Sequence, residues 1–213
     1  MTERRQLADA DRDGTLFVRE VTLAEAVPAM PGYIVRAATL ADVPHVQQAM
    51  QASGDYPADV VVSRLQDGRH PFVVEEDDRV VSYGWVALSG DNVGDMGLSI
   101  RLRSHHAYIY DCATHPSYRG RGLYPALLRV MAADLGRGGW SCVWIGTAPG
   151  NFTSQRGIVR AGFQRLGDMN LLRRPDGSFR ADIYGAPGVA EATLDDAAWS
   201  FYATAYPETG LPS

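Results

Sequence analysis

Residues 114–124 read Thr-His-Pro-Ser-Tyr-Arg-Gly-Arg-Gly-Leu-Tyr, and this stretch decides the fold of the chain. The mostly apolar residues before it, 107–113, predict a strand, and the residues after it carry apolar side chains at helical spacing. A glycine-rich loop between a strand and a helix exposes the free N–H groups and the positive dipole end of that helix. With Arg119 and Arg121 in the loop, we predict a site for a phosphate or pyrophosphate group.

The residues downstream of this loop predict a βαβ unit. The apolar face of the helix consists of Leu123, Leu127, Val130, Met131 and Leu135. Gly136 is expected to end this helix. Residues 141–147, SCVWIGT, are nearly all apolar, as in a strand covered on both faces. Two such strands joined by a crossover helix are parallel. Asn151 is then expected to cap a shorter helix that ends at Ala161-Gly162.

The remaining segments supply further strands and helices. We expect a strand at 33–38, helices at 40–51 and 58–65, a hairpin at 71–88 and a closing hairpin from 163 to 184. The predicted fold class is therefore α/β, with a central mixed sheet flanked by helices.

The same patterns divide the chain into three parts. Residues 1–31 are interpreted as an N-terminal extension and residues 32–186 as the main domain. Residues 187–213 are expected to form a tail, with a helix packed on that domain.

Composition and charge narrow the classes of function. The chain has 213 residues and a formal net charge of −5, which argues against a general nucleic-acid binder. Its 20 basic residues are all arginine, so no lysine serves as a base or forms a Schiff base. No apolar run is long enough for a membrane span and no signal region is evident, so we expect a cytoplasmic protein without a membrane partner. Cys112 and Cys142 are expected to be buried free thiols.

At the loop the sequence resembles the GNAT superfamily of acyl-CoA-dependent N-acyltransferases. That family's loop reads Arg/Gln-x-x-Gly-x-Gly/Ala, and Arg119 and Gly122 match its first two defined positions. Tyr124 stands where the family has Gly or Ala. A second family signature, Asn-x-x-Ala/Ser followed by Lys-x-Gly-Phe, is similar to residues 151–154 and 160–163. The resemblance covers roughly residues 33–184.

The resemblance implies that acetyl-CoA or another acyl-CoA is the co-substrate. It implies a sheet that splays between the strands at 107–114 and 141–147, with the pantetheine arm in the gap. A backbone amide near Cys112 or Ala113 would polarise the thioester carbonyl. The implied cofactor-binding residues are Cys112, Ala113, Thr114, Arg119, Gly120, Arg121, Gly122, Leu123, Tyr124, Asn151 and Ser154.

The catalytic base is expected on the strand before the loop, where the family often has a glutamate and this chain has none. Strand alternation places Tyr108, Tyr110 and Cys112 on one face and Asp111 on the other. Asp111 therefore reaches the site only if a bulge re-aims it. We predict that Tyr110 and Asp111 line the acceptor end as catalytic residues; a buried Tyr–Asp hydrogen bond is the alternative.

The family's frequent general acid is a tyrosine on the second helix, and Ile158 occupies that position here. The departing thiolate would then take its proton from Tyr184, Tyr124 or water, or would leave without one. The resemblance implies acyl transfer to an amine of a small molecule or peptide. A non-catalytic acyl-CoA-binding or regulatory domain and a carrier-protein donor stay open as alternatives, as does a homodimer.

An acidic pattern near the N-terminus resembles a calcium-binding loop. Asp9, Asp11, Asp13 and Glu20 fit the spacing of EF-hand ligands. However, the preceding residues do not predict the entering helix, and residues 15–22 predict a strand after an Asp-Gly turn. The histidines have no metal-ligand spacing. We predict no metal site and leave calcium binding open.

Overall fold

A computed structural model describes residues 12–27, 29–89, 91–93, 98–173, 175, 179–190, 193–194, 197 and 201–203. Within these residues the α-helices are α1 (Val43–Ser53), α2 (Val60–Gln66), α3 (Leu123–Arg137) and α4 (Phe152–Arg160). None of these helices is long and apolar enough to cross a bilayer. The strands are β1 (Gly14–Glu20), β2 (Ile34–Ala37), β3 (His70–Glu76), β4 (Arg79–Ala87), β5 (Asp91–Val93), β6 (Leu98–Ile100), β7 (His106–Thr114), β8 (Cys142–Thr147), β9 (Gln164–Arg173), β10 (Phe179–Gly185) and β11 (Phe201–Ala203).

The described strands form one mixed sheet in the order β2-β3-β4-β7-β8-β1-β9-β10-β11-β6-β5. Its parallel pair, β7 with β8, is the pair predicted from the βαβ pattern. The β3–β4 and β9–β10 hairpins are antiparallel, as predicted. The expectation of an α/β fold with a mixed sheet flanked by helices is confirmed.

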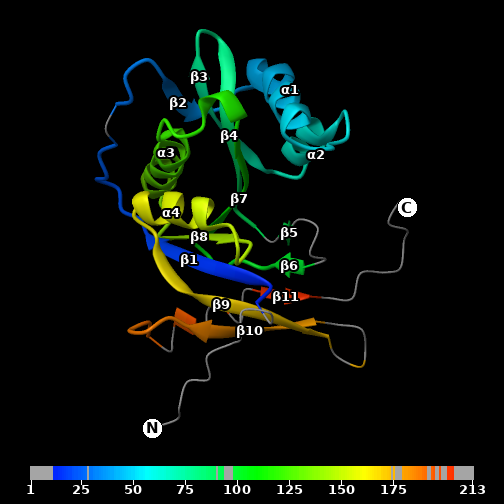
Figure 1. Cartoon of the computed structure of the whole chain (residues 1–213), viewed down its shortest axis with the longest axis vertical. Coiled ribbons are helices and arrows are strands. Elements are labelled where there is room, and N and C mark those ends of the chain that lie inside the picture. The colour runs from blue at the N-terminus through cyan, green and yellow to red at the C-terminus, as the bar shows by residue number, and fades with distance from the viewer. Residues whose placement is uncertain are drawn as a thin grey trace.

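Helices cover both faces of the sheet around β4 and β7 (Figure 1). On one face, α3 and α4 pack over a core that includes Phe72 and Ile109. On the other face, α1 and α2 bury Val46 and Val61 against Val73 and its neighbours. Phe72 and Val73 are adjacent in β3 and belong to different cores, because successive side chains of a strand point to opposite faces.

Helix α3 connects β7 to β8 and ends later than expected. It continues through Gly136 to Arg137, and its C-cap is Gly138. A Cβ at position 136 would lie 2.4 Å from the carbonyl oxygen of Thr22. Gly136 therefore permits close packing of α3 on the segment after β1, and the prediction that it ends the helix was wrong.

The parallel strands separate along their length. Their pairing runs from His106↔Cys142 to Ile109↔Ile145 and does not continue to residues 110–114 of β7. The backbone of these last residues thus has no strand partner on the β8 side among the described residues. This is the predicted splay of the sheet, and it opens at the edge where the glycine-rich loop begins.

Strand β1 is the first in the chain, yet it lies between β8 and β9 in the sheet (Figure 1). The segment interpreted as an N-terminal extension therefore contributes a central strand. An extended strand rises about 3.3 Å per residue, so Asp13 and Glu20 lie roughly 20 Å apart. They cannot ligate one ion as an EF-hand does, and Asp9 and Asp11 lie outside the described residues. No grouping of acidic, histidine or cysteine side chains in the described ranges could hold a metal ion.

Within its described residues, the C-terminal tail contains both helical residues and a strand. Residues 193–194 and 197 have helical conformation, and Ala197 is buried in a further core with Leu16 and Trp144. Phe201–Ala203 then forms β11, which pairs with β10 and β6. The tail therefore adds a strand to the sheet where only a helix was expected.

Candidate active site

The loop between β7 and α3 has the geometry of an anion-binding site. Gly120 and Gly122 have φ angles of +78° and +80°, in the left-handed region that glycine adopts without strain. Gly122 is the N-cap of α3, and no side chain among the described residues caps the helix. The first N–H groups of α3, on Leu123 and Tyr124, are thus left at the positive end of its dipole. An anion placed there would satisfy both.

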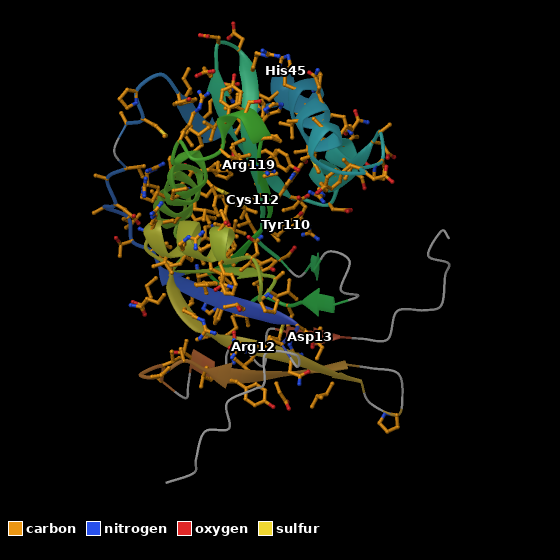
Figure 2. All side chains as sticks on the ribbon, viewed as in Figure 1. Arg12, Asp13, His45, Tyr110, Cys112 and Arg119 are labelled. Carbon is orange, nitrogen blue, oxygen red and sulfur yellow. The ribbon has the colours of Figure 1, made fainter. Side chains whose placement is uncertain are left out.

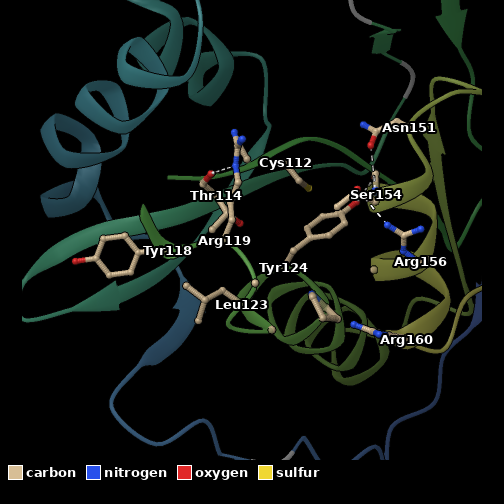
Figure 3. A pocket seen from close by; sticks show the side chains of 16 residues that line it. Cys112, Thr114, Tyr118, Arg119, Leu123, Tyr124, Asn151, Ser154, Arg156 and Arg160 are labelled. Atoms are coloured by element: carbon tan, nitrogen blue, oxygen red, sulfur yellow. Dashed lines mark hydrogen bonds between the residues drawn. The ribbon is translucent and has the colours of Figure 1, made fainter. Parts of the chain in front are cut away.

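A groove of about 640 Å³ starts at this loop and extends to α4 (Figure 3). The structure brings together around it ten of the eleven residues predicted to bind the cofactor. These ten are Cys112, Ala113, Thr114, Arg119, Gly120, Gly122, Leu123, Tyr124, Asn151 and Ser154. In the view of Figure 2, Arg119 and Cys112 lie between the helices of the two faces.

Arg121 is the predicted residue that does not line the groove. Its guanidinium lies 4.7 Å from the ring centroid of Tyr118 and donates to the hydroxyl of Tyr33 at 3.0 Å. It also donates to the carbonyl of Ser117 at 3.1 Å. These contacts hold the loop against the segment before β2. Arg121 therefore stabilises the loop, while Arg119 is the arginine of the loop that lines the groove.

Helix α4 forms the opposite wall. The side-chain oxygen of Asn151 accepts a hydrogen bond from the backbone N–H of Ser154 at 3.1 Å, which confirms Asn151 as the predicted N-cap. Arg156 and Arg160 also line the groove and were not predicted to bind the cofactor. Their spacing of four residues on a predicted helix was the signal that would have found them. With Arg119 they make the groove locally positive in a chain of net charge −5.

Tyr124 lies between α3 and α4, inside the groove (Figure 3). Its ring packs on Gly157, where a Cβ would come within 2.5 Å of Cδ1. Its hydroxyl is 3.1 Å from Oγ of Ser154. Burial raises the pKa of Tyr124 above its ordinary value, so the phenol stays protonated. Ile158, at the position of the family's frequent acid, is fully buried in the core and takes no part in the groove.

A β-bulge in β7 changes which side chains share a face. The register between β4 and β7 shifts near Gly84, and Asp111 has a φ angle of +45°. After the bulge, Cys112 packs with the core under α3, whereas Tyr110 contacts the cores on the opposite face. The prediction that Tyr110 and Cys112 share a face was therefore wrong. The extra residue turns Asp111 toward the face of the sheet that carries Tyr110. A bulge was the condition under which the sequence allowed Asp111 to reach the site.

Asp111 lies in a polar cluster between β7 and α2. Its Oδ1 accepts a hydrogen bond from the hydroxyl of Tyr56 at 2.7 Å, and its Oδ2 is 2.5 Å from Nη1 of Arg64. Burial, together with the hydrogen bond to Asp111, raises the pKa of Tyr56. Asp111 thus accepts a hydrogen bond from Tyr56, a tyrosine that the alternative did not name. The ring of Tyr110 stacks on that of Tyr108. Sequence reasoning missed Tyr56 and Arg64, because no local pattern links them to β7.

Comparison with known families decides the identity of this arrangement. Residues 39–163, more than half of the chain, match the profile of the acetyltransferase (GNAT) family. The chain belongs to the GNAT acetyltransferase family. The match includes the glycine-rich loop, α3 and α4, and it ends at Phe163 in the second family signature. The GNAT resemblance expected from the two motifs is confirmed.

Solved structures of GNAT proteins share the fold at low sequence identity. A GNAT acetyltransferase from Colwellia psychrerythraea is 13% identical with a TM-score of 0.54, over 72% of this chain and 53% of that one. Aminoglycoside acetyltransferase AAC(6')-Ib, solved with coenzyme A and kanamycin, is 18% identical with a TM-score of 0.51, over 70% and 92%. The ribosomal-protein-S18-alanine N-acetyltransferase of Escherichia coli is 15% identical with a TM-score of 0.50, over 73% and 96%.

These similarities support the GNAT fold and leave the substrate to be argued from the site. The chain spans about half the length of the first of these structures. No curated protein matches the sequence significantly.

Proposed function

We propose that this chain is an N-acyltransferase that moves an acetyl or other short acyl group from acyl-CoA to an amine of a small molecule or peptide. The observation that carries the proposal is the gap between β7 and β8 beyond Ile109, next to the uncapped start of α3. A pantetheine arm in this gap would meet the edge of β7 at residues 110–114, which has no strand partner on the β8 side among the described residues. The pyrophosphate would meet the N–H groups of α3 and the guanidinium of Arg119.

The chemistry is direct attack on the thioester. The amine nitrogen bonds to the carbonyl carbon, the C–S bond breaks, and the amine's proton leaves as the thiolate gains one. A backbone N–H near Cys112 or Ala113 would stabilise the oxyanion. Asp111 is the carboxylate within the stretch of β7 beyond Ile109, and it is our candidate for orienting and deprotonating the amine, with Tyr110 beside it. The protonated phenol of Tyr124 would donate to the sulfur.

Calorimetric titration with acetyl-CoA and free CoA tests the cofactor site. We expect wild type to bind both with dissociation constants on the order of micromolar, and Gly122→Trp to bind neither. Gly139→Trp is the matched control, because Gly139 also has a positive φ, at +85°, and open space around it, but lies at the other end of α3. Loss of binding in Gly122→Trp alone supports the site, whereas no binding to folded wild type rejects it.

A non-catalytic acyl-CoA-binding module is the second candidate. It is favoured by the bonding of Asp111, whose two oxygens already contact Tyr56 and Arg64. Measuring the release of free thiol from acetyl-CoA with a panel of amines distinguishes the two candidates. An enzyme releases thiol with at least one amine, and a binding module with none. A carrier-protein donor, docking at Arg119 and Arg156, would instead give weak binding of free CoA.

We further propose that the protein works in the cytoplasm. Cys112 and Cys142 are both free thiols, as is usual in a reducing compartment. The proposed catalytic unit is the domain at 32–186 completed by β1. The whole chain has a net charge of −5, which makes nucleic acid an unsuitable acceptor.

A further inference from the structure

The guanidinium of Arg64 lies beside Asp111, our candidate for holding the amine, inside a box of aromatic rings. Its Cζ is 5.0 Å from the ring centroid of Trp85, 5.3 Å from that of Tyr110 and 5.8 Å from that of Tyr56. Its Nη1 is 2.5 Å from Oδ2 of Asp111. Surface arginines usually sample many rotamers, but three rings and a carboxylate hold this one. Its orientation is therefore set before a ligand arrives.

The box is short of hydrogen-bond acceptors. A guanidinium carries five N–H groups, and Arg64 uses one hydrogen bond, to Asp111, within the part of the chain that the structure describes. The Arg64 side chain is 21% exposed, so part of it is open to a ligand. The indole N–H of Trp85 is buried and has no acceptor among the described residues. A ligand that brings oxygen acceptors would satisfy the unused N–H groups of Arg64, whereas the buried indole N–H lies out of reach of solvent.

The charges of the box specify what else the ligand carries. Arg64 and Asp111 are a cation and an anion side by side, and their complement is a carboxylate beside an ammonium group. An acceptor with positive charge alone would meet Arg64 at contact distance and leave the unused donors unsatisfied. Asp111 directly precedes Cys112, which lines the groove, so the amine end would lie toward the gap between the strands.

We infer that the acceptor is an α-amino acid, or a molecule with the same adjacent amine and carboxylate. Arg64 binds its carboxylate and Asp111 holds its amine. This inference rests on the proposed acyltransferase function and names the acceptor class for it. Arg64 is then the residue that determines specificity, and it is supplied by α2 rather than by either family motif.

Matched acceptors test the inference. Acetyl transfer is measured with a panel of α-amino acids and their α-carboxamides, using full-length protein and acetyl-CoA. Wild type should favour the acid over its amide by roughly 10- to 100-fold in kcat/KM, the usual effect of charge-assisted hydrogen bonds. Arg64→Gln should lose that preference, because the loss of the guanidinium slows the acid more than the amide. Arg137→Gln, at an exposed ion pair on α3, should behave as wild type.

Other outcomes overturn the inference. If amides or diamines are preferred while acetyl-CoA still binds by calorimetry, the inference fails and the acyltransferase function stands. If acetyl-CoA binds and no amine is acetylated, both fail. Arg64→Lys keeps the positive charge but lacks the paired N–H groups of a guanidinium, so we expect an intermediate preference for the acid over its amide. Arg64→Lys also provides the measurement if Arg64→Gln does not fold. If Arg64→Lys binds acetyl-CoA and keeps the full preference for the acid, the two-pronged contact of Arg64 with the acceptor's carboxylate is contradicted.

Discussion

Tyr124 stands where the family's loop motif has Gly or Ala, and on α4 Gly157 leaves the space that its ring fills. A side chain from the second residue of α3 thus reaches the groove wall at α4, one residue from Ile158. The buried Ile158 cannot donate a proton to the leaving thiolate, whereas the phenol of Tyr124 lines the same groove as Cys112. We therefore propose that these two departures from the family pattern compensate each other, with Tyr124 as the acid.

Tyr124→Phe should lower kcat by about 100-fold, a usual loss for a general acid, with little change in the KM for acetyl-CoA. Because burial raises the pKa of Tyr124, wild type should not lose activity through this group below about pH 10, the ordinary value for tyrosine. Steady-state kinetics from pH 6 to about pH 10 measures both effects. Tyr118→Phe is the control, since Tyr118 lines the groove nearer the loop. An unchanged kcat in Tyr124→Phe would mean that water, and not Tyr124, protonates the leaving thiolate.

At the scale of elements, side-chain hydrogen bonds fix where helix α1 starts relative to the sheet. Asp42 ends the short 3₁₀ turn before α1, and its carboxylate accepts hydrogen bonds from Arg36 in β2 at 2.7 and 2.8 Å. It also accepts from the backbone N–H of Thr39 at 2.6 Å. The hydrogen bonds from Arg36, more than any other contact, hold the pKa of Asp42 well below its ordinary value.

Asp42→Asn should lower the free energy of unfolding at pH 7 by about 1–3 kcal/mol. A carboxylate whose pKa is lowered in the folded state stabilises above its unfolded pKa, near 4, and loses that contribution as the pH falls. The difference from wild type should therefore shrink at pH 3, as measured by urea unfolding. Asp134→Asn, at an exposed pair with Arg137, should cost about 0.5 kcal/mol or less. Equal losses of unfolding free energy in Asp42→Asn at pH 7 and pH 3 would contradict an ionic origin of the stabilisation by Asp42.

At the scale of the whole molecule, the first strand of the chain completes the middle of the sheet. Strand β1 pairs with β8 on one side and with β9 on the other. Phe17, which is 1% exposed, reaches the core beneath α3, and Leu16 reaches the core on the opposite face. The N-terminal segment thus joins the half of the sheet that carries the groove to the half formed by β9, β10 and β11.

Phe17→Ala should destabilise the protein by about 3–5 kcal/mol, the usual cost of removing a buried aromatic side chain. Chemical unfolding of the two variants Phe17→Ala and Leu23→Ala provides the comparison. Leu23 is 73% exposed just after β1, and its truncation should change stability by about 0.5 kcal/mol or less. A small effect of Phe17→Ala would mean that β1 is peripheral to the folding unit.

The sequence alone determined the features that depend on neighbouring residues. Helical spacing predicted α3, alternation and turn residues predicted the β3–β4 and β9–β10 hairpins, and the loop glycines predicted the anion site. These follow from local periodicity and backbone conformation, which a short window of sequence contains. Ten of the predicted cofactor residues met at one groove because they flank the two ends of a single βαβ unit and the helix after it.

Only the tertiary structure decided which distant residues meet. The β7 bulge moved Cys112 away from the face of Tyr110, and α2 brought Arg64 to Asp111 from 47 positions earlier in the chain. The place of β1 between β8 and β9 was likewise hidden, because strand pairing between remote segments depends on register and shared core surface across the whole sheet. A single extra residue in a strand reverses every side chain beyond it, so the faces of an acceptor site cannot be assigned until its pairing is known.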